Sequence, residues 1–304
     1  MINLKSLKLI LSLSISIAAV YITSVATLGL FMPNHWNTEL DGSEFSQLSN
    51  GKVRYSEIGS GSDTILFLHG FNSQMSIWNR VWDKLDHCHH SIRLDIPGFG
   101  QSTWDTESYT LEEQSKRLYE FIKSKKLNKL TLVGASMGGA LSITFASLYP
   151  DLVKSLILIA PSGYPGSLIY RKPFTELIKT NWFRPAAIWI AESRLYKFAF
   201  PKSIALQSLT VTSSYNNQWV ENLKSIESQV ILIWSTGDTA VDYKYASSVS
   251  NNLKNNSLIT LPENVNHNAP NLASSLISDL ACYLAKNETI NKPELMNFKV
   301  DEIK

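Results

Sequence analysis

Short apolar runs alternate with amphipathic stretches along most of the chain. The apolar or β-branched runs predict strands at 51–58, 64–68, 91–95, 130–133, 156–160, 229–234 and 257–261. Patterns with helical spacing predict helices at 77–85, 109–125, 140–149, 243–253 and 271–284. Strands that alternate with helices are typical of a parallel sheet covered on both faces. The pattern therefore predicts an α/β fold with a mostly parallel central sheet and helices on both faces.

The N-terminus departs from this pattern. Residues 9–32 form an uncharged run of 24 residues, and as a helix they would span roughly 36 Å, enough to cross a bilayer core. Lys5 and Lys8 precede the run and acidic residues follow it, which predicts a cytoplasmic N-terminus and a body on the non-cytoplasmic side, periplasmic in a Gram-negative cell. We expect a membrane anchor.

Two alternatives exist for this segment. A cleavable signal peptide could end at Ser24-Val25-Ala26 and release a secreted protein. The apolar run continues through Phe31, however, which favours an uncleaved anchor. A buried core helix is less favoured because the run is apolar on all sides.

The predicted domain organisation has five parts. After the anchor or signal segment at 1–32, residues 33–50 are polar and irregular and predict a linker. The α/β core is expected at 51–160 and 226–286, with an insertion at 161–225 and a polar tail at 287–304. The insertion is longer than an ordinary crossover and rich in aromatic residues. We interpret it as a helical cap over the active site, although its aromatic residues could equally hold the insertion together.

Composition narrows the function without assigning it. The 304 residues suffice for one large α/β domain with an insertion, and 44% of them are hydrophobic. A net charge of +2, without a stripe of Lys and Arg, gives no reason to expect nucleic-acid binding. The two cysteines, Cys88 and Cys282, form no disulfide framework, and two free thiols are expected, although pairing in an oxidising compartment stays open.

The strongest chemical motif is Gly134-Ala-Ser136-Met-Gly138, which lies between the predicted strand 130–133 and a helical pattern. Strand, tight turn and helix are the context in which G-x-S-x-G indicates a nucleophile elbow. The serine on such a turn is expected to have a strained backbone, and larger side chains in place of Gly134 and Gly138 would collide. Ser136 is the predicted nucleophile.

A base and an acid must follow this nucleophile in the chain. Asp238 lies on the loop after the predicted strand 229–234, and Asp242 is the reserve candidate, better suited to beginning a helix. Asp95 precedes Ser136 and suits a structural turn. His267 is the only histidine after Asp238, so Ser136, Asp238 and His267 complete the order Ser, Asp, His.

The remaining histidines have simpler interpretations. His69 adjoins a glycine turn and is expected to hydrogen-bond its own loop. The run His87-Cys88-His89-His90 invites a metal hypothesis, but adjacent residues cannot all face one ion and no second cluster completes a site. A solvated loop is favoured there, and no metal or organic cofactor is expected.

From about residue 51 to 284 the chain resembles the α/β-hydrolase family. The resemblance rests on the elbow, on Asp238 and His267, and on the segments 69–71 and 95–102. It implies that the backbone N–H groups of Phe71 and Met137 form an oxyanion hole. Serine at the elbow separates the chain from members similar to haloalkane dehalogenases and epoxide hydrolases, which carry Asp there.

The anchor, the aromatic cap and Ser136-Met-Gly-Gly resemble membrane-anchored monoacylglycerol-lipase-like enzymes and bacterial lipases. Three residues depart from such sequences: Gln229 where Pro is frequent, Ser235 where Gly often follows Trp, and Asn266 where Gly often precedes the histidine. These changes are local and leave the triad intact.

The resemblance implies a serine hydrolase that cleaves carboxylic esters, with a small lipid-like ester as its partner. Hydrolysis of a C–C, thioester or amide bond by the same triad is the alternative, and a non-catalytic binding protein is less favoured. Acyl chain length and oligomeric state stay open.

Overall fold

The computed structural model describes residues 14–16, 19, 42–85, 90–104, 108–168, 211–286 and 289–290. The chain divides into two compact units, Met1–Thr38 and Glu39–Lys304, and the second contains every predicted site residue. Most of the expected anchor, residues 169–210 of the expected cap and most of the expected tail lie outside the described residues. Within those described, no helix is long and apolar enough to cross a membrane.

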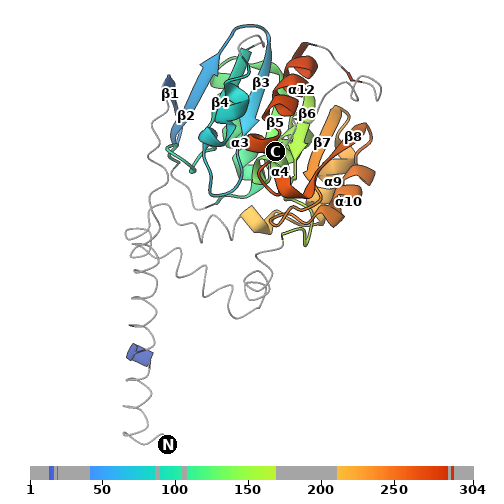
Figure 1. The fold of residues 1–304 in the computed structure, drawn as a ribbon. Helices are drawn as coiled ribbons and strands as arrows, with labels where there is room; N and C mark the ends of the chain where they lie inside the picture. The colour runs from blue at the N-terminus through green and yellow to red at the C-terminus, as the bar shows by residue number, and fades with distance from the viewer. Residues whose placement is uncertain are drawn as a thin grey trace, which may run out of the picture. The chain divides into compact units, whose positions relative to one another are not determined.

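The described part of the second unit is organised around one eight-stranded sheet with the order β1-β2-β4-β3-β5-β6-β7-β8 (Figure 1). Its strands are β1 (Ser43–Leu48), β2 (Gly51–Ile58), β3 (Asp63–Leu68), β4 (His90–Leu94), β5 (Asn128–Ala135), β6 (Val153–Ile159), β7 (Gln229–Ser235) and β8 (Asn256–Leu261). The pairs β1–β2 and β2–β4 are antiparallel, and all other neighbours are parallel.

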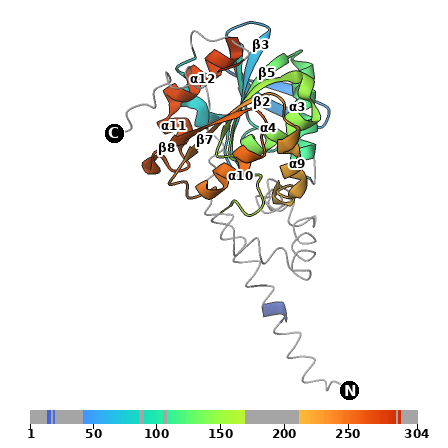
Figure 2. The ribbon, with the colours of Figure 1, turned by 90° about the vertical axis from the view of Figure 1, so that its right-hand side faces the viewer.

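Helices cover both faces of this sheet (Figure 2). One face carries α3 (Leu111–Ser124), α4 (Met137–Leu148), α9 (Asn217–Ser225) and α10 (Ala246–Asn251). The other carries α2 (Asn79–Trp82), α11 (Ala269–Leu272) and α12 (Ser274–Lys286). Short 3₁₀ helices lie at Met75–Trp78, Pro150–Leu152, Tyr243–Tyr245 and Glu263–Val265. The predicted fold class is confirmed.

The alternation of side chains along each central strand produces two hydrophobic cores. In β7, Val230, Leu232 and Trp234 face the core beneath α4, whereas Ile231 and Ile233 face the core beneath α12. A strand buried on both faces must be apolar at every position, which explains its uninterrupted apolar sequence. The carboxyl ends of the parallel strands meet at one edge, where α/β proteins bind ligands.

The structure differs from the sequence prediction at the first strand. Residues 33–50 were expected to be an irregular linker, but β1 occupies Ser43–Leu48 and pairs with β2 along its whole length. This strand is a polar edge strand with Phe45 exposed. Its hydrophobic pattern is weak because it is held by backbone pairing more than by burial.

The cysteine prediction also needs correction. Cys282, on α12, is disulfide-bonded, so the expectation of a free thiol is wrong for this residue. The other cysteine of the sequence, Cys88, lies outside the described residues. The spacing of the two cysteines along the chain could not predict this bond, because it depends on which residues the fold brings together.

Candidate active site

Ser136 lies on the sharp turn between β5 and α4. Its backbone has φ of 53° and ψ of −115°, a conformation that non-glycine residues rarely adopt. Three backbone hydrogen bonds hold the turn: Ser136 N–H donates to the carbonyl of Ile159, and its own carbonyl accepts from Ala140 and Ser162. The half-buried side chain does not cap α4, which leaves Oγ available. The expected strain is present.

The two glycines of the elbow are required by packing. A β-carbon on Gly134 would overlap the carbonyl of Gly138, and a β-carbon on Gly138 would overlap the carbonyls of Leu68 and His69. The start of α4 therefore lies directly against the end of β3. The predicted collision is confirmed, and it brings the loop after β3 next to the nucleophile.

That loop contains Gly70 and Phe71. A β-carbon on Gly70 would lie 3.3 Å from Cβ of Ser136 and 3.9 Å from its Oγ, so this backbone passes beside the nucleophile. Phe71 is half-buried, with its ring 5.7 Å from that of Phe99. Met137 is buried at the first position of α4, where helix N–H groups have no helical acceptor. Met137 directly follows Ser136 and Phe71 directly follows Gly70, and the role of their N–H groups as oxyanion donors stays a prediction.

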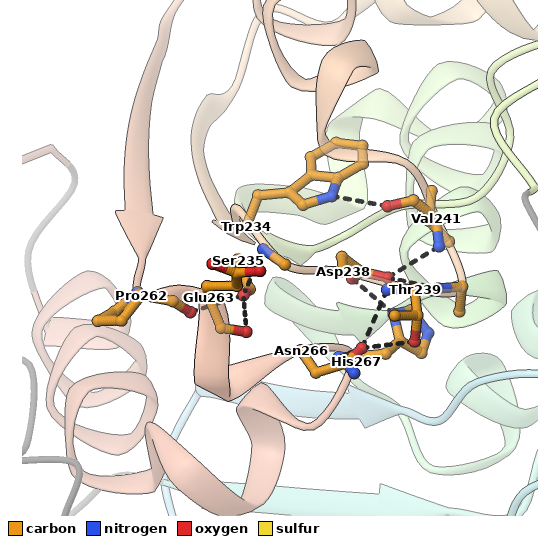
Figure 3. A network of polar contacts seen from close by, with 11 residues as sticks. Trp234, Ser235, Asp238, Thr239, Val241, Pro262, Glu263, Asn266 and His267 are labelled. Atoms are coloured by element: carbon orange, nitrogen blue, oxygen red, sulfur yellow. Dashed lines mark hydrogen bonds and ion pairs between the residues drawn. The ribbon is translucent and has the colours of Figure 1, made fainter.

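Asp238 and His267 come together from the loops after β7 and β8 (Figure 3). His267 Nδ1 lies 2.7 Å from Asp238 Oδ2. Since a carboxylate can only accept, Nδ1 carries the proton and Nε2 is left as the basic nitrogen. The Asp238 side chain is fully buried, whereas that of His267 is 31% exposed. This arrangement orients a base with one basic nitrogen free to take a proton.

The loop after β7 provides hydrogen bonds to the Asp238 carboxylate. Asp238 Oδ1 accepts from the backbone N–H groups of Ala240 at 2.9 Å and Val241 at 2.8 Å. The Val241 carbonyl in turn accepts from the indole of Trp234 at 3.0 Å. Each carboxylate oxygen therefore has a partner, and the acid is fixed before any substrate binds.

A small cavity lies at this edge of the sheet beside the Asp238–His267 pair. Its lining includes Ala135, next to Ser136, together with Asp238 and His267. In the described part of the chain, Ser136 Oγ forms no hydrogen bond with His267. Hydrogen bonds between nucleophile and base are often long without substrate and tighten in the complex.

Known proteins are similar to this chain in sequence or in fold. A model of the alpha/beta hydrolase fold matches residues 63–203. Monoacylglycerol lipase abhd6-A of Xenopus laevis is 27% identical over 83% of this chain and 85% of its own length. Lipase 3 of Moraxella sp. (strain TA144) is 35% identical over 42% and 41%. A solved thermophilic esterase from Thermogutta terrifontis has a TM-score of 0.64 and 17% identity, covering 81% of this chain and 100% of that one.

The chain has the α/β-hydrolase fold. At 17% identity the solved esterase supports the fold alone, while the two lipases are similar in sequence as well. The chain covers 85% of the monoacylglycerol lipase but 41% of Lipase 3. The shared fold assigns the scaffold, and the chemistry has to be argued from the site itself.

Two buried side chains near Ser136 have structural contacts. His69 Nδ1 donates to the Gly70 carbonyl at 2.7 Å, and Nε2 accepts from Ile96 N–H at 3.0 Å. Desolvation lowers the pKa of the His69 imidazole, which keeps it neutral. Asp95 accepts from the N–H groups of Met75 at 2.7 Å and Gln101 at 2.8 Å. Both residues thus brace the loop beside Ser136, as their sequence context indicated.

The other candidate residues make contacts away from Ser136 and the Asp238–His267 pair. Asp242 caps a 3₁₀ helix by accepting from Lys244 N–H at 3.1 Å, and its carboxylate pairs with the Lys244 ammonium. His90 is in β4, where its ring contacts Glu57 and Thr64, each at 3.0 Å. His90 therefore does not belong to a solvated loop as predicted. Across the residues described, no three metal-ligating side chains cluster, and residues 87–89 lie outside them.

The sequence did not predict the residues that connect the loop of Asp238 with the loop of His267. Ser235 Oγ donates to the Pro262 carbonyl at 2.7 Å, and Asn266 Oδ1 accepts from Thr239. The signal was present, because both Ser235 and Asn266 depart from the residues frequent at these positions. Their partners could not be identified without the fold.

Proposed function

We propose that this chain is a serine hydrolase that cleaves carboxylic esters, with Ser136 as nucleophile, His267 as base and Asp238 as the residue that orients the base. The observation that carries the proposal is the 2.7 Å contact between His267 Nδ1 and Asp238 Oδ2. It occurs at the edge of the sheet where β5 ends in the strained serine. The names of the similar proteins support the same reaction class.

In this mechanism His267 Nε2 takes the proton of Ser136 as Oγ attacks the ester carbonyl. Asp238 stabilises the imidazolium that forms. The N–H groups of Phe71 and Met137 bind the oxyanion, each contributing about 3 kcal/mol to the transition state by analogy with measured donors. The alcohol leaves with the proton from His267. Water, activated by the same histidine, then hydrolyses the acyl-enzyme, which releases the carboxylic acid and regenerates the Ser136 hydroxyl. The reaction needs no cofactor.

The proposed substrate is an ester of a fatty acid, of the kind that monoacylglycerol lipases and lipases cleave. The support is the similarity to proteins with those names. A panel of monoacylglycerols and p-nitrophenyl esters of increasing acyl length tests this substrate class. Higher kcat/KM for long acyl chains than for acetate is expected, and the opposite preference would indicate a small-ester carboxylesterase.

The nucleophile is tested by Ser136→Ala in the full chain. We expect loss of p-nitrophenyl ester hydrolysis and of covalent labelling by a fluorophosphonate, with the melting temperature unchanged. Ser147→Ala is the matched control, since Ser147 lies on the same helix, α4, and its hydroxyl contacts Ser225 away from the site. Full labelling of Ser136→Ala would contradict the proposal.

We further propose that residues 9–32 anchor the enzyme in a membrane, with the body on the non-cytoplasmic side. The support is the charge pattern of the sequence and the disulfide at Cys282, because disulfides persist in oxidising compartments. The full chain should stay with membranes after alkaline extraction, and in spheroplasts the body should be cleaved by added protease. Release by alkali, or protection from protease, would refute the anchor or its orientation.

A further inference from the structure

Asn266 has an unusual backbone for a residue with a side chain. Its φ is 51° and its ψ is −141°, directly before His267. Glycine adopts this conformation freely, whereas any L-residue is strained there. A side chain retained at such a position needs compensating contacts, and the side-chain hydrogen bonds of Asn266 go to Thr239 and His267, at the proposed site.

A single atom of Asn266 makes these contacts. Its Oδ1 accepts from Thr239 N–H at 2.9 Å, from Thr239 Oγ1 at 2.7 Å and from His267 N–H at 2.7 Å (Figure 3). Thr239 follows Asp238 on the loop after β7, and His267 is on the loop after β8. The amide oxygen therefore binds the residue after the proposed acid and the backbone N–H of the proposed base at once.

We propose that Asn266 is a positioning residue that fixes the Asp238–His267 pair by clamping together the two loops that carry it. This inference rests on the proposed hydrolase function. Asp238 is held within its own loop through Ala240 and Val241. His267 donates its backbone N–H to Asn266 Oδ1 and its Nδ1 proton to Asp238 Oδ2. Asn266 sets the distance that their hydrogen bond requires.

The packing of the two loops shows why the clamp acts at this place. Nearer the sheet, Thr236 N–H donates to Leu261 and Ser235 Oγ to Pro262, and Gly237 is so close to Glu263 that a β-carbon would overlap its carbonyl. Further from the sheet, Thr239 is exposed and His267 is part-exposed. The loops are therefore in tight contact at their base, and Asn266 joins them at their tips beside the reacting nitrogen.

Asn266→Gly in the full chain is the test, because glycine removes the amide oxygen and adopts the observed backbone without strain. We expect kcat for a p-nitrophenyl ester to fall by about tenfold or more, because small displacements of catalytic groups are costly. KM and the melting temperature should change little. In proton NMR, the low-field signal of the His267 Nδ1 proton should broaden or shift.

Two further variants complete the design. Thr239→Val removes one of the three donors and should lower kcat by about threefold, as expected for one hydrogen bond, and it should add nothing to Asn266→Gly in the double variant. Asn264→Gly is the matched control, the same change two residues away at an exposed position, and it should keep kcat.

The outcomes separate this inference from the proposed function. If wild-type protein neither hydrolyses esters nor reacts with a fluorophosphonate, the proposed function fails. If wild-type protein is active and Asn266→Gly retains its kcat and its NMR signal, Asn266 is not a positioning residue. A lower melting temperature with unchanged kcat would also refute the clamp, since it would indicate a structural role alone.

Discussion

The carbonyl oxygen of Gly138 occupies the space that a β-carbon on Gly134 would need. Gly134→Ala should therefore force the elbow open, because the obstacle is backbone and not a flexible side chain. We expect the free energy of unfolding to fall by about 2 kcal/mol or more, together with loss of fluorophosphonate labelling. Urea denaturation and labelling measure the two effects.

Gly139→Ala is a less disruptive substitution on the same turn and serves as a comparison for Gly134→Ala. Its β-carbon would approach Cβ of Pro161 at 3.0 Å and the carbonyl of Gly134 at 3.1 Å, which is tight but without overlap. The loss of stability should be smaller than for Gly134→Ala. Equal losses for the two variants would mean that the elbow tolerates displacement.

Asp238→Asn tests the orienting role of the acid. The amide would favour the wrong tautomer of His267, and kcat should fall by about 10³–10⁴-fold, as in established triads. Asp242→Asn is the matched control, because Asp242 is four residues further along and pairs with Lys244. Its kcat should stay within about twofold of wild type. Similar losses in both variants would contradict the assignment of Asp238.

Asp95→Asn should affect stability and not chemistry. The carboxylate is fully buried, accepts from Met75 and Gln101, and lies 3.9 Å from the buried guanidinium of Arg54. Without its charge, Arg54 is left beside a neutral amide, so the free energy of unfolding should fall by about 3 kcal/mol. The kcat of the folded enzyme should persist, and a collapse of kcat at full stability would instead make Asp95 the triad acid.

Acidification should destabilise the folded protein, because His69 takes up a proton less readily in the folded chain than in the unfolded one. Burial lowers the pKa of this imidazole below its usual value of 6.5, although the nearby Asp95 opposes the shift. Below about pH 6.5 the unfolded chain binds a proton that the folded chain does not, so stability is complete above this pH and declines as the pH falls. The contribution is at most about 1.4 kcal/mol per pH unit.

Urea denaturation at pH 7.5 and 5.5 measures this loss. In His69→Gln the stability should depend less on pH over this window, whatever its absolute value, because the titrating group is gone. An unchanged pH dependence would mean that His69 binds its proton equally well in the folded chain.

The sequence predicted the sheet well where burial determines it. Val230 to Trp234 is apolar at every position because both faces of β7 are covered, and such runs are easily recognised. Strand β1 was missed, because its polar residues form an edge strand through backbone pairing with β2. Hydrogen bonding between strands leaves little trace in composition.

In the candidate site, too, some features could be predicted from the sequence and others could not. The sequence predicts that Ser136, Asp238 and His267 come together, because each follows a predicted strand and parallel strands bring their carboxyl ends to one edge. The contacts of Asn266 and the disulfide at Cys282 could not be predicted, since each depends on a partner that only the folded chain brings near. The sequence indicated Asn266 as unusual without indicating what it binds.

The order of the sheet has a consequence for biosynthesis. The proposed nucleophile follows β5, whereas the proposed base follows β8. Strand β8 forms the opposite edge from β1 and is the last strand of the sheet to leave the ribosome. A nascent chain can complete the elbow more than one hundred residues before it can add β8 beside β7. Ser136 should therefore stay without its base until most of the enzyme has been made, so that hydrolytic activity would report completion of the sheet.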